Sequence, residues 1–397
     1  MMDTKTELIL NRRRQRIRVA AFAALVFAAV MFSPEVPAQL CEHLFRPETP
    51  VCEHCLARAR KLHCESFVCD LHADPVLWNR DLNKRRGWGN KGHVDFPKLR
   101  EGGVNLQVMG IPTLGPYCRA SASLLGLTQG YPLRAQLGVV NRAHWMIDKM
   151  ERDIARSNGT VALIHDPTEL ERNIQCGRLS VMFAIEGGQI LEGDARNLDC
   201  FFNRGVRMIG MAHFQPNDLG GATYRQSDSQ RGLTEIGRQV VCRANDLGMI
   251  VDMSHSSEQA IREILSLSRA PLIFSHTGVD GVTPLDRNIS DEAICGVARS
   301  GGVIGIIFHR GYVGGPSVDD VVNHIMYVVN LAGPEHVAYG SDFAGVIRPP
   351  EGVRDVSDLP VITAALMKHG LSEGDLKLIL GENFRRVYHQ IWAARRQ

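Results

Sequence analysis

Six histidine and carboxylate residues each come at or just after a short apolar segment, and together they are the types that bind divalent metal ions. They are His72, Asp74, Glu186, His255, His276 and Asp342. Imidazole nitrogen and carboxylate oxygen suit Zn²⁺ and also Mn²⁺ or Co²⁺. His72 and Asp74 are two residues apart, so in an extended strand their side chains point to the same face. One ion can therefore bind both. The sequence therefore predicts a metal centre.

The same residues are sufficient for two ions. Glu186 stands alone after its segment, and its two carboxylate oxygens can bridge a pair of metals. His255 and His276 can complete the second ion, while Asp342 can bind the first or accept a proton from water. Two ions about 3.5–4 Å apart would activate a water between them and polarise a carbonyl group. This is hydrolytic chemistry, and it implies no redox cofactor.

The apolar segments that carry these residues alternate with helical segments, which is typical of parallel β/α units. Eight strands are predicted, at residues 67–69, 104–108, 181–185, 208–211, 249–253, 272–274, 303–307 and 337–339. Six of the eight are followed by a His, Asp or Glu, His213 after the fourth among them. Because the carboxyl ends of the strands of a (β/α)8 barrel converge on the face that carries the active site, this pattern predicts a TIM-like barrel.

The amino-terminal part of the chain predicts export. Five arginines between positions 12 and 18 precede the uncharged residues 19–32, and Val36-Pro37-Ala38 is a candidate cleavage site. The expected divisions are residues 1–38 as signal peptide or uncleaved membrane anchor, 39–64 as a Cys-rich extension, and 65–397 as the barrel. Either form of the first segment places the barrel outside the cytoplasm, in the periplasm or an equivalent compartment. Forty-five Lys and Arg against 43 Asp and Glu give no reason to expect nucleic acid binding.

Five of the ten cysteines fall early in the chain. They are Cys41, Cys52, Cys55, Cys64 and Cys69. The Cys52-x-x-Cys55 pair with the two cysteines that follow could form a small zinc knot, but disulfides are favoured in an oxidising compartment. The pairing does not follow from the sequence.

Several segments resemble the membrane (renal) dipeptidase family of binuclear zinc metallopeptidases. They include DLHAD at 70–74, AIEGG at 184–188, LGMIVDMSHSS at 247–257, APLIFSHTG at 270–278, DRNISD at 286–291 and GSDFAG at 340–345. Their order and spacing make the resemblance specific, and it extends over residues 67–388.

The resemblance implies two Zn²⁺ per subunit and hydrolysis of dipeptides by a water that bridges the two ions. His72, Asp74 and Asp342 would serve one ion, His255 and His276 the other, with Glu186 between them. Asp342 would also shuttle the proton, His213 would stabilise the oxyanion, and Arg287 would bind the substrate carboxylate. Without the resemblance, the alternatives are that His213 is an uncommitted polar residue and that Arg287 is part of a surface ion pair.

Alternatives stay open at this point. The metal site alone does not separate a dipeptidase from a hydrolase of another small carboxylate-bearing amide, a lactone or a β-lactam. A non-catalytic exported binding protein would have lost a ligand or His213, and all of them are present. The loop around Gly110 and the segment after His213 depart from the family pattern, which leaves the side-chain pockets undetermined. The resemblance also leaves open a homodimer and association with a membrane through the amino-terminal segment.

Overall fold

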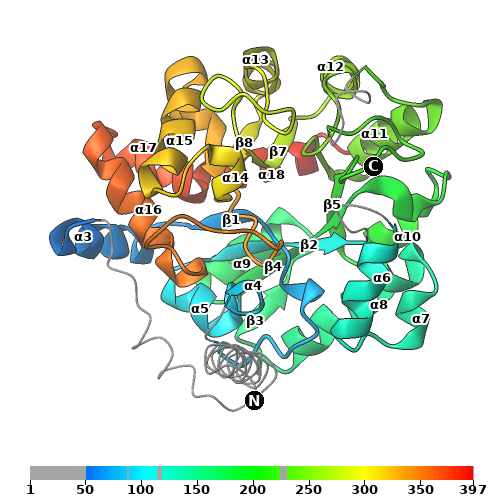
Figure 1. The fold of residues 1–397 in the computed structure, drawn as a ribbon, viewed down its shortest axis with the longest axis horizontal. Coiled ribbons are helices and arrows are strands. Elements are labelled where there is room, and N and C mark those ends of the chain that lie inside the picture. The colour runs from blue at the N-terminus through cyan, green and yellow to red at the C-terminus, as the bar shows by residue number, and fades with distance from the viewer. Residues whose placement is uncertain (1–50, 87–88, 114–118, 224–229, 397) are drawn as a thin grey trace, which may run out of the picture. The chain divides into compact units, whose positions relative to one another are not determined.

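Eight parallel strands close into a barrel with helices around the outside (Figure 1), which confirms the predicted (β/α)8 fold. The computed structural model describes residues 51–86, 89–113, 119–223 and 230–396. The barrel strands are β1 (Cys69–Ala73), β2 (Leu106–Pro112), β4 (Leu179–Glu186), β5 (Val206–Gly210), β6 (Ile250–Asp252), β7 (Ile273–Thr277), β8 (Val303–Ile306) and β9 (Val337–Tyr339). They run in the order β2-β1-β9-β8-β7-β6-β5-β4, and the pairing of β2 with β4 closes the ring.

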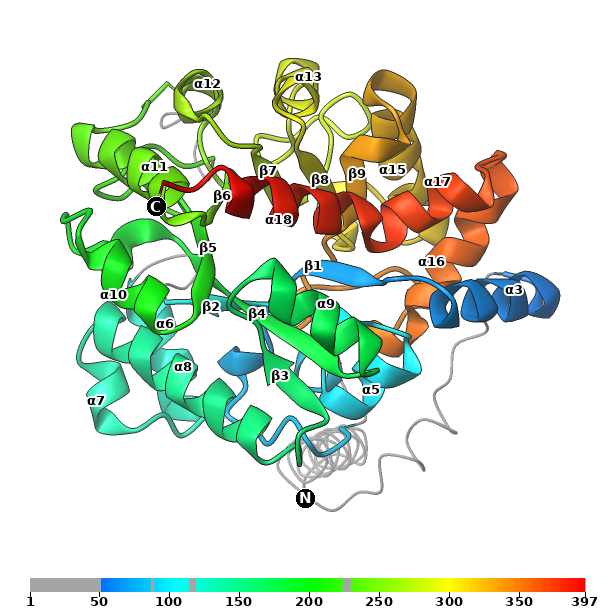
Figure 2. The same cartoon turned by 180° about the vertical axis from the view of Figure 1, so that it is seen from behind.

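One strand was not predicted. β3 (Val161–Leu163) lies outside the ring and pairs only with β4, as Figure 2 shows from behind. β3 pairs with the amino-terminal part of β4, where Val161 lies opposite Leu179. β5 pairs with β4 further along that strand, from Phe183 onward. Three residues, of which only Val161 is buried, are too few to give the continuous apolar run by which the other strands were recognised.

The helices alternate with the strands. They are α3 (Glu53–Cys64), α4 (Gly89–Gly92), α5 (Phe96–Glu101), α6 (Arg119–Thr128), α7 (Leu133–Gln136), α8 (Val139–Ala155), α9 (Pro167–Gln175), α10 (Asn197–Asn203), α11 (Glu235–Leu247), α12 (Glu258–Leu267), α13 (Asp291–Ser300), α14 (Arg310–Val313), α15 (Val318–Ala332), α16 (Leu359–Leu366), α17 (Glu373–Lys377) and α18 (Asn383–Ala393). The end signals act as the sequence predicts. At α11 the hydroxyl of Thr234 accepts from the N–H of Gly237, and Gly248 ends the helix at φ 74°.

The barrel strands are buried on both faces, and each face contributes to a different part of the core. Leu106 and Val108 of β2 point into the barrel, whereas Met109 and Ile111 pack between the barrel and its helices. A strand of a parallel sheet covered on both sides has this continuous apolar character. The apolar packing holds each strand rigidly, so the residues at its carboxyl end have fixed positions.

The helix before the first barrel strand, α3, packs against α16 through Leu56, Ala59 and Leu62. The predicted signal or anchor at 1–38 lies outside the described residues, as do Cys41 and Cys118. The eight described cysteines are free thiols in this structure, and the predicted pairing stays a prediction. No helix among the described residues combines the length and the apolar character needed to traverse a bilayer.

Candidate metal centre

The six predicted metal-binding residues all lie together at the carboxyl ends of barrel strands. His72 and His276 are within β1 and β7, and Glu186 is the last residue of β4. The other three follow β1, β6 and β9, and all six are buried: His72, Asp74, Glu186, His255, His276 and Asp342. Three overlapping groups of these residues, one of them including His213, have ligand atoms within 4.8 Å of one another.

Glu186 is the centre of the cluster. Its Oε1 lies 3.5 Å from His72 Nε2 and 3.4 Å from His255 Nε2. The same oxygen is 3.7 Å from His276 Nε2 and 3.4 Å from His213 Nε2. A single carboxylate that faces four imidazoles from different strands is well placed to be shared between two ions.

Several buried polar atoms of the cluster have no hydrogen-bond partner among the described residues. They are both ring nitrogens of His72, Asp74 Oδ1, Glu186 Oε2 and His213 Nδ1. The Nε2 atoms of His255 and His276 also face each other at 3.0 Å. Buried polar atoms are normally paired, because leaving one unpaired costs about 1–3 kcal/mol. Nitrogen and oxygen donors that converge without partners suit a divalent cation, so the residues present match a metal site.

The electrostatics of the cluster favour the same conclusion. Burial and the neighbouring Asp74 carboxylate raise the pKa of Glu186 well above its usual range. Burial likewise raises the pKa of Asp342 to about 8, against the opposing effect of His72. Burial lowers the pKa of His255 and His276 well below the usual value, which keeps both imidazoles neutral. Carboxylates confined in a buried site repel one another, and a divalent cation would relieve that repulsion.

A buried Asp–Ser pair orients one of the histidines. Ser275 Oγ donates to Asp252 Oδ2 at 2.5 Å and lies 2.9 Å from His276 Nδ1. With its proton committed to Asp252, the hydroxyl accepts from Nδ1–H of His276. This assigns the tautomer whose Nε2 lone pair points into the cluster, as metal-binding histidines require.

A second Asp–Ser pair joins the first and last barrel strands. Asp70 Oδ1 accepts from Ser341 N at 2.8 Å, and Asp70 Oδ2 accepts from Ser341 Oγ at 2.6 Å. Ser341 Oγ is also 3.2 Å from the carbonyl oxygen of His72. Sequence reasoning missed these supporting residues. The available signal was the serine directly before both His276 and Asp342, together with an aspartate just upstream of His72 and His255.

Two of the six residues have a left-handed backbone, at φ 65° for His255 and φ 60° for Asp342. Such a conformation costs a non-glycine residue about 1–3 kcal/mol and persists only where surrounding contacts enforce it. Nearby, a Cβ at Gly110 would lie 2.1 Å from Asp74 Oδ1, and one at Gly345 would lie 2.2 Å from Asp342 Oδ1. The surrounding contacts therefore enforce a strained backbone at His255 and Asp342, and the close approach of Gly110 and Gly345 leaves the side chains of Asp74 and Asp342 little room to move.

His213 and Arg287, the two residues assigned by resemblance, border the cluster. The ring of His213 lies edge-on to that of His255 with centroids 4.8 Å apart. Arg287 is buried, and its Nη2 donates to the carbonyl oxygen of His276 at 2.9 Å. No carboxylate among the described residues lies within ion-pair distance of Arg287, and its Nε has no hydrogen-bond partner there. The open alternative of a surface ion pair is thus wrong, since the guanidinium is buried beside the cluster.

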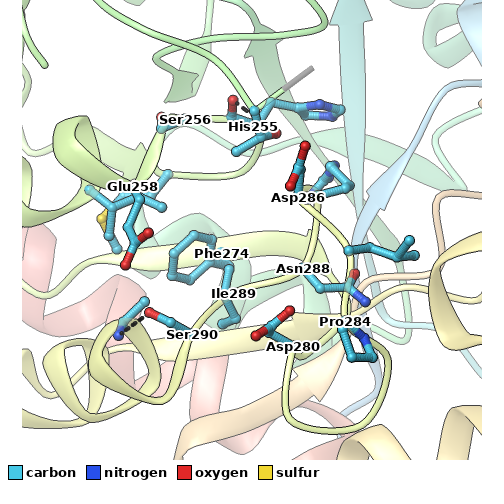
Figure 3. A pocket seen from close by; sticks show the side chains of 16 residues that line it. His255, Ser256, Glu258, Phe274, Asp280, Pro284, Asp286, Asn288, Ile289 and Ser290 are labelled. Carbon is cyan, nitrogen blue, oxygen red and sulfur yellow. Dashed lines mark hydrogen bonds between the residues drawn. The ribbon is translucent and has the colours of Figure 1, made fainter. Parts of the chain in front are cut away.

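A cavity of about 370 Å³ opens beside this guanidinium (Figure 3). His255, Phe274 and Arg287 are among the residues that line it. The carboxylates of Asp280 and Asp286 lie around it, from the loop that follows β7. A cavity of this size holds a small molecule and not a folded protein segment.

Comparison with known proteins identifies the chain's relatives. Residues 56–397 match the family described as Membrane dipeptidase (Peptidase family M19). Dipeptidase aclJ of Aspergillus oryzae is 30% identical over 335 residues, which cover 81% of this chain and 77% of that protein. Dipeptidase ataJ of Aspergillus terreus is 29% identical over 370 residues, or 85% of this chain and 87% of that one.

Among solved structures, the chain is similar to a metallo peptidase from Rhodobacter sphaeroides, liganded with a phosphinate mimic of the dipeptide L-Ala-D-Ala. The TM-score is 0.72 at 26% identity, and the match covers 82% of this chain and all of that one (100%).

Proposed function

The chain belongs to the membrane dipeptidase family, peptidase family M19, and from that premise we propose that it hydrolyses free dipeptides with two zinc ions. That it is a metal-dependent hydrolase of this family follows from the family match. The identity and number of the ions and the substrate are the proposal. The observation that carries it is the position of Glu186 Oε1, within 3.4–3.7 Å of four imidazole nitrogens from four strands.

His72, Asp74 and Asp342 would hold one ion. His255 and His276 would hold the other, and Glu186 would be shared between the two. Two observations support this division. The ring nitrogens of His72 and Asp74 Oδ1 have no hydrogen-bond partner among the described residues, and the Nε2 atoms of His255 and His276 face each other at 3.0 Å. Zn²⁺ bound there would supply Lewis-acid polarisation of the scissile carbonyl and lower the pKa of water.

The chain's own residues would carry out the remaining steps. Asp342 would take the proton of the attacking water and deliver it to the leaving amine. Its raised pKa, about 8 in the metal-free site, reflects burial beside Asp74. His213, within 3.4 Å of Glu186, would donate to the oxyanion of the tetrahedral intermediate.

Arg287 would select the substrate. A buried guanidinium with no carboxylate partner can bind a substrate carboxylate through two parallel hydrogen bonds. Because Arg287 contacts the main chain of His276, that carboxylate would lie next to the scissile bond, as the C-terminal carboxylate of a dipeptide does. The relative from R. sphaeroides that binds a dipeptide mimic supports the same substrate class.

Export and association are proposed separately. The basic residues at 12–18 and the uncharged residues at 19–32 support secretion or amino-terminal anchoring, with the barrel outside the cytoplasm. A homodimer is proposed only because members of the family often form dimers. Neither proposal affects the chemistry of the site.

The test uses the full-length chain, stripped of metal and reloaded with Zn²⁺, Mn²⁺ or Co²⁺. Release of free amine is measured from L-L and L-D dipeptides, from the matching dipeptide amides, from N-blocked dipeptides and from a β-lactam. We expect two equivalents of zinc per chain and cleavage of free dipeptides, lost by a factor of about 10³ or more in Glu186→Gln. Arg287→Met should abolish the preference for dipeptides over their amides. Two bound metals without dipeptide cleavage would overturn the substrate, and no metal binding would overturn the whole proposal.

A further inference from the structure

Two adjacent thiols at the start of α3 take no part in the metal centre. Cys52 is the N-cap residue of this 12-residue helix, and its Sγ accepts a hydrogen bond from the N–H of Cys55 at 3.3 Å. Cys52 is exposed and Cys55 is half-buried. The pair has the Cys-x-x-Cys spacing, so the two sulfurs lie on the same end of one helix.

We propose that Cys52 and Cys55 are a thiol–disulfide exchange pair that reacts with small disulfides such as glutathione disulfide. A helix amino terminus carries a partial positive charge that stabilises a thiolate at the N-cap position. The backbone N–H that points at Cys52 Sγ contributes in the same sense. An exposed N-cap thiol with a second thiol one turn later is the arrangement that attack and resolution require.

The two thiols are not equivalent. The side-chain hydrogen bond from Cys55, followed by the N–H of the same residue, lowers the pKa of Cys52. The reciprocal hydrogen bond raises the pKa of Cys55. The ammonium of Lys368, near the start of α3, favours the thiolate at both positions. Cys52 is therefore the attacking sulfur and Cys55 the resolving one.

The exchange balances without a further reactant. The Cys52 thiolate attacks one sulfur of glutathione disulfide, forms a mixed disulfide and releases one glutathione. Cys55 then loses its proton and attacks Cys52 Sγ, which breaks the mixed disulfide and releases the second glutathione. Two cysteine thiols are oxidised to one disulfide, glutathione disulfide is reduced, and the two thiol protons leave on the two glutathione molecules.

Among the described residues, the neighbouring cysteines Cys64 and Cys69 do not compete for this pair. Cys64 is at the opposite end of α3, which at 1.5 Å per residue places it roughly 18 Å along the helix axis from Cys52. Cys69 is buried in β1. The early cysteines within the described residues thus form no four-sulfur zinc knot, and exposed Cys64 serves as a matched control thiol on the same helix.

The first measurement is the rate of alkylation at each cysteine of the reduced full-length chain at pH 7, by mass spectrometry. We expect Cys52 to react at least about threefold faster than Cys64, because a larger fraction of it is thiolate. Equal rates would overturn the assignment of Cys52 as the attacking thiol.

The second measurement incubates the same chain with glutathione disulfide and maps the products. We expect a Cys52–Cys55 disulfide in the wild type, glutathione trapped on Cys52 in Cys55→Ser, and neither product in Cys52→Ser. Serine is itself a good N-cap, so Cys52→Ser keeps the start of α3 intact. Dipeptide hydrolysis should be unchanged in both variants, because neither cysteine belongs to the metal centre. Glutathione retained on both cysteines without a disulfide, or a Cys41–Cys52 link in place of the internal one, would overturn the proposal.

Discussion

Two buried histidines, His72 at the metal centre and His63 on α3, differ in whether their ring nitrogens have hydrogen-bond partners. At the carboxyl ends of the strands, neither ring nitrogen of His72 has a hydrogen-bond partner among the described residues. On α3, His63 Nδ1 lies 2.8 Å from the carbonyl oxygen of Gly102, and Nε2 lies 2.7 Å from Thr363 Oγ1. Both side chains are equally buried, at 2% exposure. Burial alone therefore does not separate a ligand from a structural residue, whereas hydrogen-bond satisfaction does.

The satisfied histidine belongs to a network that ties α3 to the barrel. Thr363 Oγ1 of α16 is also 2.9 Å from the hydroxyl of Tyr339, a residue of β9. Nδ1–H of His63 donates to Gly102, so its Nε2 accepts from Thr363. The side-chain polar atoms of His63, Thr363 and Tyr339 thus all have hydrogen-bond partners among the described residues, and this network offers no unpaired atom to a ligand.

The largest expected effect is the loss of catalysis on replacing the unpaired histidine. We expect His72→Gln to lower kcat/KM for a dipeptide by about 10³-fold or more, because His72 Nε2 lies 3.5 Å from both Glu186 and Asp74. The substitution removes no hydrogen bond of His72 among the described residues, only its contacts with three carboxylates at 3.5–3.9 Å, so the metal-free chain should still unfold in one cooperative transition. Urea titration and metal analysis check both parts.

His63→Gln is the matched variant. It should lower the free energy of unfolding by about 2 kcal/mol while leaving kcat/KM per folded molecule unchanged. If instead His72→Gln unfolded the protein and His63→Gln spared it, the distinction between the two histidines would be wrong.

A pH titration of stability sharpens the same comparison. Burial, opposed by the hydrogen bond to Gly102, lowers the pKa of His63 from 6.5 to about 4. The unfolded chain therefore binds more protons than the folded one between these values, and stability falls as pH falls. The contribution of His63 is complete above pH 6.5, and about 3 kcal/mol of it is lost by pH 4.

Other groups titrate in the same range, so the quantity to measure is the difference between wild type and His63→Gln. The wild type's advantage of about 2 kcal/mol at pH 7 should close near pH 5 and reverse by about 1 kcal/mol at pH 4 in urea titrations. A gap that stays constant would mean that His63 is not held neutral in the folded state.

The sequence predicts that the six side chains converge, because they share one structural position. Each follows or ends a buried strand, and the (β/α)8 fold brings the carboxyl ends of all strands together. Glu186 and His276 are 90 residues apart in the chain, yet no detail of loop structure is needed to expect them in one site. Arg287 needed the family resemblance, since its loop has no such regularity. The strand pattern placed His213, and only its role needed the resemblance.

The rest depends on contacts that no local pattern specifies. His63 and Thr363 are 300 residues apart, and no local pattern in the sequence marks either one. The support of His276 by Ser275 depends on the direction of a hydroxyl, and the left-handed backbones of His255 and Asp342 depend on the packing around them. β3 was not predicted because three residues, one buried and two half-buried, give no periodic signal.

Glycines offer the last test, because two of them touch the two regions compared above. A Cβ at Gly110 would lie 2.1 Å from Asp74 Oδ1 and 3.2 Å from His72 Cε1. We expect Gly110→Ala to displace these side chains and lower kcat/KM by about 10²-fold, since misplacement near 1 Å costs that much. A Cβ at Gly103, where φ is 74°, would lie 2.9 Å from His63 Cβ.

Gly103→Ala should therefore act on stability, with a loss of about 1–2 kcal/mol in urea titrations and unchanged kcat/KM. Gly374→Ala is the control, because its nearest neighbour would be Ser372 Oγ at an ordinary 3.5 Å. The free energy of unfolding of Gly374→Ala should change little or rise slightly, because alanine is the better helix former. If Gly110→Ala kept full activity, Asp74 would have room to move, and the cluster would be less rigid than its orphaned atoms and strained backbone imply.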